Sequence, residues 1–292
     1  MKANPFFRRT ACILCFLVCM CLPCSSNPQG DFTENWWEND MLIAKGYGYP
    51  PGNAGTPYQE RLLARRAAIV DGYRKLAEKA KSIRITSEKT LGVQIDNDSV
   101  TKEKINALIH DAKVLSTEFD DNGVCTVVLS VPLYGVKDSI ANVALSPVDK
   151  ENFPLPSENN IAQGNYTGLI IDCGDADLNP VLLPTIRNEN NQAVYAYNNL
   201  DYDKIISNGM IGYLKKDSRV GGKFFSVCAA KDISRAGSNP LVIKATALSD
   251  DNTCPVVSTS DADKILAENQ LSHFLDEGAV VFTGYRVGGV RA

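Results

Sequence analysis

In the first half of the chain, apolar and polar residues alternate as in strands in some segments, and apolar residues recur with helical spacing in others. MLIAKGYG over residues 41–48 predicts a strand. Residues 57–80 predict an amphipathic helix, with Thr56 as the expected N-cap, Pro57 at the first helical position and Gln59 completing a capping box. The face expected to pack on the core comprises Leu62, Ile69, Tyr73, Leu76 and Ala80.

Three more segments complete this region. Residues 82–95 alternate in a way that predicts a strand, and Asp98 or Ser99 is expected to cap a shorter helix. Residues 114–119 and 124–133 flank the turn sequence DDNG and predict a β-hairpin. The order β-α-β-α-β-β predicts an α+β fold, with both helices on one face of a mainly antiparallel sheet.

A polar stretch with three prolines and little periodicity, residues 146–164, is expected to be an interdomain linker. Beyond it, short apolar runs predict strands, and a helix is expected over residues 260–275. The expected strands are residues 166–173, 179–186, 192–197, 223–230, 239–248 and 278–285. We therefore predict two independently stable domains, residues 41–145 and residues 165–292, the second being a mainly-β α+β domain.

Residues 1–26 have the organisation of a secretory signal peptide. A basic stretch ending at Arg9 precedes an apolar run over residues 11–22, which is too short to cross a hydrocarbon layer of ~30 Å as a helix. Cleavage is expected near Ser26. Lipidation at Cys24 is the alternative, although the residue before it is not small as in bacterial lipoproteins. Both alternatives imply export, to the periplasm or to the outer membrane and cell surface.

The composition is that of a folded protein, with 292 residues of which 44% are hydrophobic. The formal net charge is -4, but residues 1–26 hold three basic groups and no acidic one. Removing them leaves 27 basic against 34 acidic groups, a net charge of -7. An acidic protein of this kind is not expected to bind nucleic acid.

Four cysteines follow the expected signal peptide, namely Cys125, Cys173, Cys228 and Cys254. Their spacing matches no zinc-ligand pattern. In an oxidising compartment one or two disulfides could form, and three pairings remain open. Cys125 is expected to be a small buried residue in the middle of a strand.

Three segments carry a resemblance to known proteins: AKGYG, the helix ERLLARRAAIVDGYRKLAEKAKSIRI and the hairpin VLSTEFDDNGVCTVVLSVPLYG. Over residues 41–142 the chain resembles the Lpp-twenty family of small envelope lipoproteins and the N-terminal domain of flagellar assembly protein T. The resemblance implies a surface or envelope protein without catalysis that often self-associates, with envelope or flagellar-type proteins as partners. The C-terminal region is similar to an uncharacterised module that accompanies such domains in envelope proteins.

No catalytic, metal or cofactor site is predicted. Asp175, Asp177 and Asn179 begin like an EF-hand loop, but Pro180 and Ile186 stand where that loop needs Gly and Glu. The two histidines are expected near helix ends, as partners of the helix dipole or as surface residues. The alternative to a non-enzymatic role is a small-ligand-binding or enzymatic C-terminal domain that uses a cluster of carboxylates. Its candidate residues are Asp172, Asp175, Asp177 and Asp263.

Candidate interaction residues lie in three places. Trp36 and Trp37 are expected to pack on the first domain or to insert at a membrane or partner interface. Arg61 and Arg65 belong to a basic helix surface that is either solvated or contacts an anionic partner. Val128 is expected in or near a homodimer contact, because both faces of its strand are at least partly apolar. Peripheral membrane attachment is a further expectation.

Overall fold

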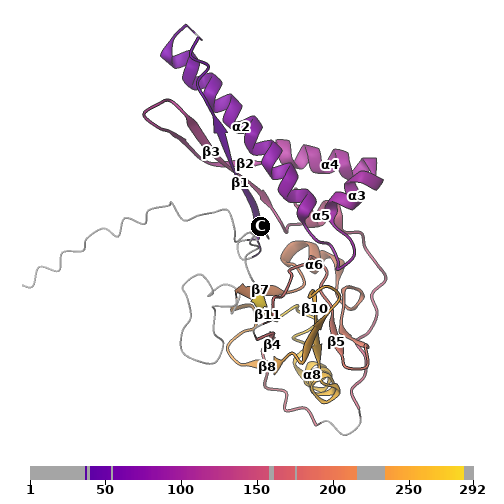
Figure 1. Cartoon of the computed structure of the whole chain (residues 1–292). Helices are drawn as coiled ribbons and strands as arrows, with labels where there is room; N and C mark the ends of the chain where they lie inside the picture. The colour runs from indigo at the N-terminus through magenta and orange to yellow at the C-terminus, as the bar shows by residue number, and fades with distance from the viewer. Residues whose placement is uncertain are drawn as a thin grey trace, which may run out of the picture. The chain divides into compact units, whose positions relative to one another are not determined.

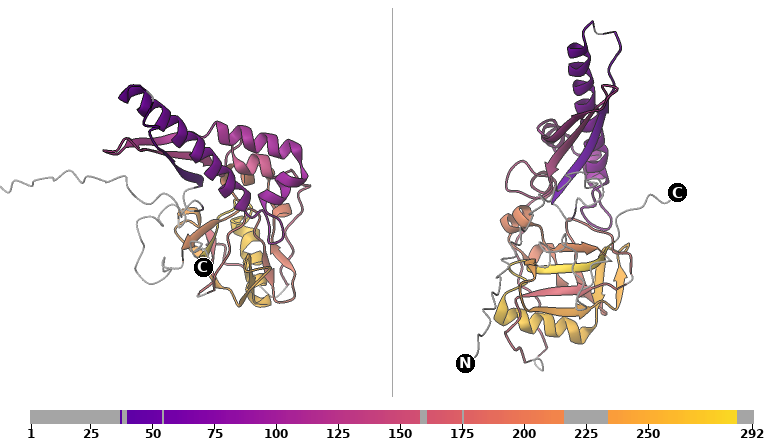
Figure 2. Two further views of the ribbon diagram at one scale, coloured as in Figure 1. Left: turned by 45° about the horizontal axis from the view of Figure 1, so that its top comes forward. Right: turned by 90° about the vertical axis from the view of Figure 1, so that its left-hand side faces the viewer.

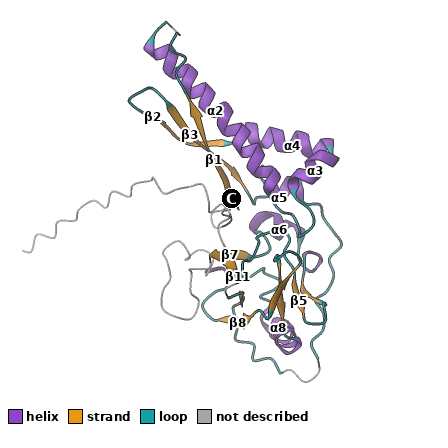
Figure 3. Ribbon diagram, viewed as in Figure 1, coloured by secondary structure: helices purple, strands orange, loops and turns teal. Residues whose placement is uncertain are grey.

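The computed structural model describes residues 37, 40–53, 55–157, 161–174, 176–215 and 234–285 (Figure 1). Its helices and strands confirm the α+β class, and Figure 3 distinguishes them by colour. The expected signal peptide and the expected strand 223–230 lie outside the described residues. In the described part of the chain, no helix has the length and apolar character needed to cross a membrane.

The N-terminal region contains a three-stranded antiparallel sheet. The strands β1 (Met41–Gly48), β3 (Cys125–Pro132) and β2 (Lys113–Phe119) lie in that order, so β1 and β2 are its edges. Helix α2 (Pro57–Ser82) runs along one face of this sheet (Figures 1 and 3). The shorter helices are α3 (Leu91–Asn97), α4 (Ser99–His110) and α5 (Ile140–Ala144).

The strand expected over residues 82–95 does not form. Thr90 accepts a hydrogen bond from the Val93 N–H and so caps helix α3, and an isolated bridge from Arg84 to Thr90 is the β-pairing found there. The carbonyl of Arg84 accepts a hydrogen bond from the Leu182 N–H at 3.0 Å instead. The alternation was misleading because the segment combines a short extended piece with a capped helix.

Helix α2 packs on β1 through small residues. Its buried residues are Ala64, Ala68, Gly72, Leu76 and Ala80. A Cβ atom built on Gly46 would lie 2.0 Å from the carbonyl oxygen of Ala68, so the strand and the helix approach too closely for any side chain there. The expected core face was wrong at Leu62, which is exposed. Leu76 and Ala80 are buried as expected, and Ile69 and Tyr73 are half-buried and pack against the core.

The C-terminal region contains two four-stranded sheets. The first is parallel, in the order β7-β11-β4-β8, and the second, in the order β6-β5-β10-β9, is mixed (Figure 2). The first comprises β4 (Gly168–Asp172), β7 (Gly212–Lys215), β8 (Pro240–Lys244) and β11 (Val280–Tyr285). The second comprises β5 (Ile186–Asn188), β6 (Ala193–Tyr195), β9 (Ala247–Ser249) and β10 (Cys254–Val257). The helices are α6 (Tyr202–Asn208), α8 (Thr259–Ser272) and the 3-10 helix η1 (Tyr197–Asn199).

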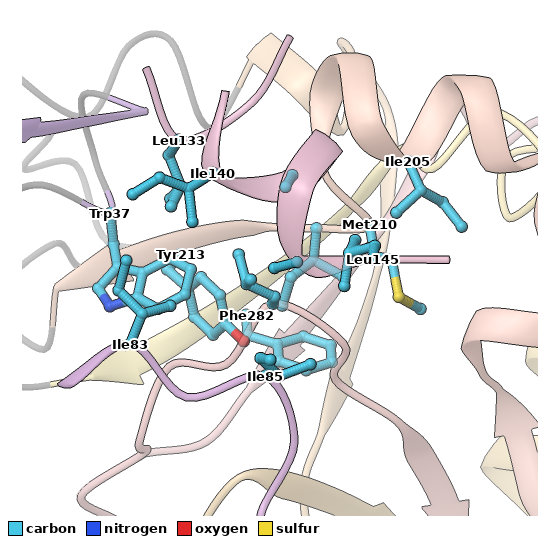
Figure 4. Packing of buried hydrophobic residues seen from close by; sticks show 14 of the residues in the cluster. Trp37, Ile83, Ile85, Leu133, Ile140, Leu145, Ile205, Met210, Tyr213 and Phe282 are labelled. Carbon is cyan, nitrogen blue, oxygen red and sulfur yellow. The ribbon is translucent and has the colours of Figure 1, made fainter. Parts of the chain in front are cut away.

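Buried side chains of both regions belong to one hydrophobic cluster (Figure 4). Tyr213 lies within it, edge-on to Trp37 with ring centroids 5.4 Å apart and edge-on to Phe282 at 6.1 Å. The Tyr213 hydroxyl is also paired, because it donates to the carbonyl of Val181 and accepts from the N–H of the same residue. A large aromatic side chain is thus buried without an unsatisfied polar atom.

The stretch expected to be a linker, residues 146–164, has neither helix nor strand among its described residues. It is nevertheless hydrogen-bonded to the C-terminal region, since Glu268 accepts from the N–H groups of Gln163 and Gly164 and Asp263 accepts from Ser157. The independent stability of residues 41–145 and 165–292 stays a prediction.

Candidate functional site: the outer face of helix α2

Helix α2 begins as the sequence indicates. The Thr56 side chain accepts a hydrogen bond from the Gln59 N–H at 3.2 Å, and Pro57 occupies the first turn. These two residues fix the start of the helix. The N–H groups of a first helical turn have no partner within the helix: the Thr56 side chain pairs with one of them, and proline has no N–H to pair. The first turns of α2 are therefore well defined although few of their side chains are buried.

Large apolar side chains project from α2 away from the sheet. Leu62 is 49% exposed, Leu63 is 46% exposed and Val70 is 61% exposed. Together with the exposed Arg66 they form what we call the α2 outer face: Leu62, Leu63, Arg66 and Val70. Single exposed apolar residues are ordinary, but several on one helix face are typical of an interaction surface.

The close approach of β1 explains why these side chains lie outside. Cβ atoms on Gly46 or Gly48 would overlap the backbone of α2, which leaves room only for alanine and glycine at the facing positions Ala64, Ala68 and Gly72. We call this contact between α2 and β1 the N-terminal seam. A leucine turned into it would need the helix to move away from the strand. Along this contact the helix therefore buries alanine and glycine, while Leu62, Leu63 and Val70 remain exposed.

The basic residues of α2 differ between its two halves. In the second half, Arg74 forms ion pairs with Asp71 and Glu78. In the first half, the Arg61 guanidinium lies over the Phe119 ring, 4.8 Å from its centroid, and Arg65 is exposed. Such a cation–π contact leaves the positive charge available. The surface around the α2 outer face is thus basic as well as apolar.

Polar side chains of α2 also cover the free edge of β1. Lys79 Nζ donates to the carbonyl of Ile43 at 2.8 Å, Lys75 Nζ donates to that of Lys45 at 3.1 Å, and Asp71 accepts from the N–H of Tyr47 at 3.0 Å. Capping of this kind protects an edge strand against pairing with another chain.

We call the contacts of Lys75, Lys79 and Asp71 with the free edge of β1 the N-terminal edge network. Asp71 is at its centre, because it also forms ion pairs with Lys75 and Arg74. Burial by itself would raise the pKa of Asp71. Hydrogen bonds from Lys75, from the Tyr47 N–H and from Arg74 outweigh burial and lower the pKa from 3.8 to about 2. The carboxylate is therefore ionised across the physiological pH range and acts as a structural acceptor.

Several sequence candidates occupy other environments. Trp37 is buried against Tyr213 of the C-terminal region, so it is a core residue here. Val128 is buried, on the sheet face opposite α2 and in register with Lys45. Trp36, Cys24 and Asp175 lie outside the described residues.

Two carboxylates of the alternative site, Asp172 and Asp263, are held by separate partners. Asp172, at the carboxyl end of β4, accepts from the N–H of Gly174 at 2.9 Å and from Thr283 Oγ1 at 3.2 Å. Asp263 accepts from the hydroxyl of Ser157 at 2.6 Å. Among the described residues, no group of three or more His, Cys, Asp or Glu side chains could hold a metal ion.

The remaining candidate side chains have structural environments. Cys125, Cys173 and Cys254 are buried free thiols, and burial raises the pKa of each, that of Cys173 to about 12. Thiols of this kind are poor nucleophiles. His110 lies in the last turn of α4 with its ring edge-on to that of Tyr73, and His273 is the C-cap of α8.

Sequence reasoning identified the basic residues of α2 but assigned Leu62 to the core. The signal that would have shown the α2 outer face is present in the chain. Gly46 and Gly48 alternate on one face of a strand, and Ala64, Ala68 and Gly72 recur every four residues on the following helix. Small residues on both partners indicate a close strand–helix contact that excludes large side chains.

Comparison with protein families gives a similarity for the C-terminal region. Residues 168–283 match the family described as Treponema pallidum Tp0624, second domain. The match begins at β4 and ends within β11, so it covers both C-terminal sheets and less than half of the chain. No match is found among curated proteins. The similarity of residues 41–142 to the Lpp-twenty family thus rests on the sequence segments alone.

Proposed function

We propose that this chain is an exported bacterial envelope protein with a non-enzymatic, protein-interaction or assembly role. The observation that carries the proposal is the α2 outer face, where Leu62, Leu63 and Val70 remain exposed while alanines are buried. Export is supported by the organisation of residues 1–26, and an envelope role by the resemblance of residues 41–142 to Lpp-twenty-type lipoproteins.

The expected partner is a protein surface that is apolar at its centre and acidic at its rim. Burying the α2 outer face would remove apolar side chains from water, which is the main source of association free energy. Arg66 belongs to this face, and Arg61 and Arg65 lie beside it on α2. Among the described residues, none of the three is paired with an acidic side chain. Acidic groups of a partner would therefore be complementary and would also speed its association.

A photo-crosslinking residue at position 63 of the full chain tests this proposal in the bacterial envelope. We expect a covalent adduct with one defined protein, and loss of that adduct when Val70→Glu is added. Leu155 is 83% exposed and lies outside α2, so the same probe at position 155 is the matched control. Equal capture at both positions would refute a role for the α2 outer face.

Binding to the purified partner should then weaken at least about tenfold with Leu62→Glu, which corresponds to about 1.4 kcal/mol. Leu155→Glu should leave the dissociation constant unchanged. Mass spectrometry of the protein from the envelope fraction tests export separately. We expect cleavage near Ser26. A diacylglyceryl group on Cys24 would instead support the lipoprotein alternative, and an intact Met1 would contradict cleavage.

A second function, ligand binding or catalysis in the C-terminal domain, has one observation in its favour. Asp172 lies at the carboxyl end of a central strand of a parallel sheet, where open parallel sheets commonly bind ligands. However, Asp172 already accepts two hydrogen bonds within the protein, and Asp263 is bonded to Ser157. The protein-interaction role is therefore the better supported of the two.

A further inference from the structure

A hollow of about 290 Å³ lies where β1 begins, β3 ends and α4 leads into β2. No residue of α2 lines it, so it is separate from the α2 outer face. Its walls are largely apolar and include Met41 and Leu108. We call it the Ser130 hollow. Its volume is at the lower limit for ligand pockets, which suits an amino-acid side chain or a small molecule of similar size.

Ser130 is one of the residues that line this hollow, and its hydroxyl is buried and unsatisfied. Ser130 is 1% exposed, and its Oγ has no hydrogen-bond partner. Ser130 belongs to β3, the central strand of the sheet, and is paired with Ile43 on one side and with Lys113 on the other. A buried hydroxyl without a partner destabilises the folded protein, so a ligand that bonds to it recovers free energy that the protein alone does not.

Charged residues at the hollow favour a cation. Asp111 and Asp138 contribute two carboxylates against the single ammonium group of Lys113. None of these three side chains pairs with another described residue. Helix α4 ends at His110 with Asp111 as its C-cap, so its partial negative charge adds to that of the carboxylates.

From these observations we propose that the Ser130 hollow binds an alkylammonium group: an aliphatic stem along Met41 and Leu108, with the ammonium group near Asp111 and Asp138 and within reach of the Ser130 hydroxyl. The lysine side chain of a polypeptide and a free aliphatic amine both have this chemistry. The proposal does not depend on the α2 outer face, and the two can be tested on the same protein.

Three probes of matched length test the proposal by NMR titration of the full chain: n-pentylamine, 1-pentanol and pentanoate. We expect pentylamine to cause saturable shifts of the Leu108, Lys113 and Ser130 amides and to bind at least tenfold more tightly than pentanoate. Equal or tighter binding of pentanol or pentanoate would overturn the assignment of charge. Absence of saturable shifts with pentylamine would overturn the site.

Variants connect the binding to these residues. Asp138→Asn should weaken pentylamine binding several-fold, and Lys113→Gln should strengthen it. Ser130→Ala should weaken it in a protein that remains folded, because removing an unpaired hydroxyl does not destabilise the core. Asp121→Asn is the matched control, since Asp121 lines a different hollow at the β2–β3 turn. Equal effects of Asp138→Asn and Asp121→Asn would overturn the proposal.

A fourth probe, Nα-acetyl-lysine methylamide, distinguishes the two sources of the ligand. Binding as tight as that of pentylamine supports a lysine side chain of a partner polypeptide, because the peptide groups are then accommodated at the mouth. Binding at least tenfold weaker supports a free aliphatic amine.

Discussion

The two regions of this protein use large apolar side chains in opposite ways. In the C-terminal parallel sheet, successive residues of β4 and β11 are buried whichever face they point to, as Ile170, Ile171, Val281 and Phe282 show. In the N-terminal region, Leu76 is the one large residue among the five that α2 buries. A sheet covered on both faces has little apolar surface left for a partner, whereas a helix packed through alanine and glycine retains its leucines and valines outside.

This difference has a structural origin in β1. Glycines at positions 46 and 48 let α2 lie directly on the strand, and the free edge of that strand is capped by Lys75, Lys79 and Asp71. The helix is thereby held by backbone proximity and polar contacts. Leu62, Leu63 and Val70 are not needed for the core, so they are available for recognition.

The largest effect should come from removing a large residue of the C-terminal core. Phe282→Ala should lower the free energy of unfolding by about 3–5 kcal/mol, because it loses a fully buried ring and leaves a cavity. Val70→Ala on α2 should change it by less than about 0.5 kcal/mol. Denaturant titration measures both. Comparable losses in the two variants would contradict the contrast between the regions.

The next effect should come from enlarging a small residue of the N-terminal seam. Ala68→Leu should destabilise the protein by about 1–3 kcal/mol, since a larger side chain must push α2 away from Gly46. Ala67→Leu is the matched control, because the neighbouring position is exposed. If both substitutions are tolerated equally in denaturant titration, the seam is looser than its distances indicate.

Acid should weaken the N-terminal edge network through Asp71. Its pKa is lowered from 3.8 to about 2, so the folded state favours the carboxylate. The resulting stabilisation, about 1–2 kcal/mol after allowance for partial exposure, is fully present above the unfolded-state pKa and is lost as the pH falls toward the folded-state value. Asp71→Asn should remove this contribution at neutral pH.

Unfolding curves recorded at several pH values test this. The wild type should be more stable than Asp71→Asn at neutral pH, and the difference should shrink between the two pKa values. Glu88→Gln is a control, since Glu88 is exposed and forms no ion pair with another described residue. A difference that does not change with pH would show that Asp71 acts through packing or hydrogen bonds alone.

Local chemistry and composition were sufficient to predict part of the structure. Thr56 and Pro57 fixed the start of α2, and alternation located β1 and the β2–β3 hairpin. Hydrophobic spacing located Leu76 and Ala80 correctly on the core face of α2 but misplaced Leu62, because the glycines of β1 leave room only for small residues at the start of the contact. The Ser130 hollow could not be foreseen, since it lies between the ends of β1, α4, β2 and β3, which meet only in the folded chain.

The smallest effect concerns the helix caps, and it compares the two regions directly. Thr56 caps α2 and Ser258 caps α8, each by accepting a hydrogen bond from an N–H in the first turn. Replacing either residue with alanine should cost about 1 kcal/mol. The location of that loss should differ. The first turns of α2 bury only Ala64 and then Ala68, whereas α8 buries Ala262, Ile265 and Leu266 within its first eight residues. Hydrogen exchange should therefore show local opening of residues 58–63 in Thr56→Ala, while the loss in Ser258→Ala should appear in global unfolding. Local opening in both variants would mean that burial does not anchor α8 more firmly than α2, and the contrast between the two regions would then hold for their sheets but not for their helices.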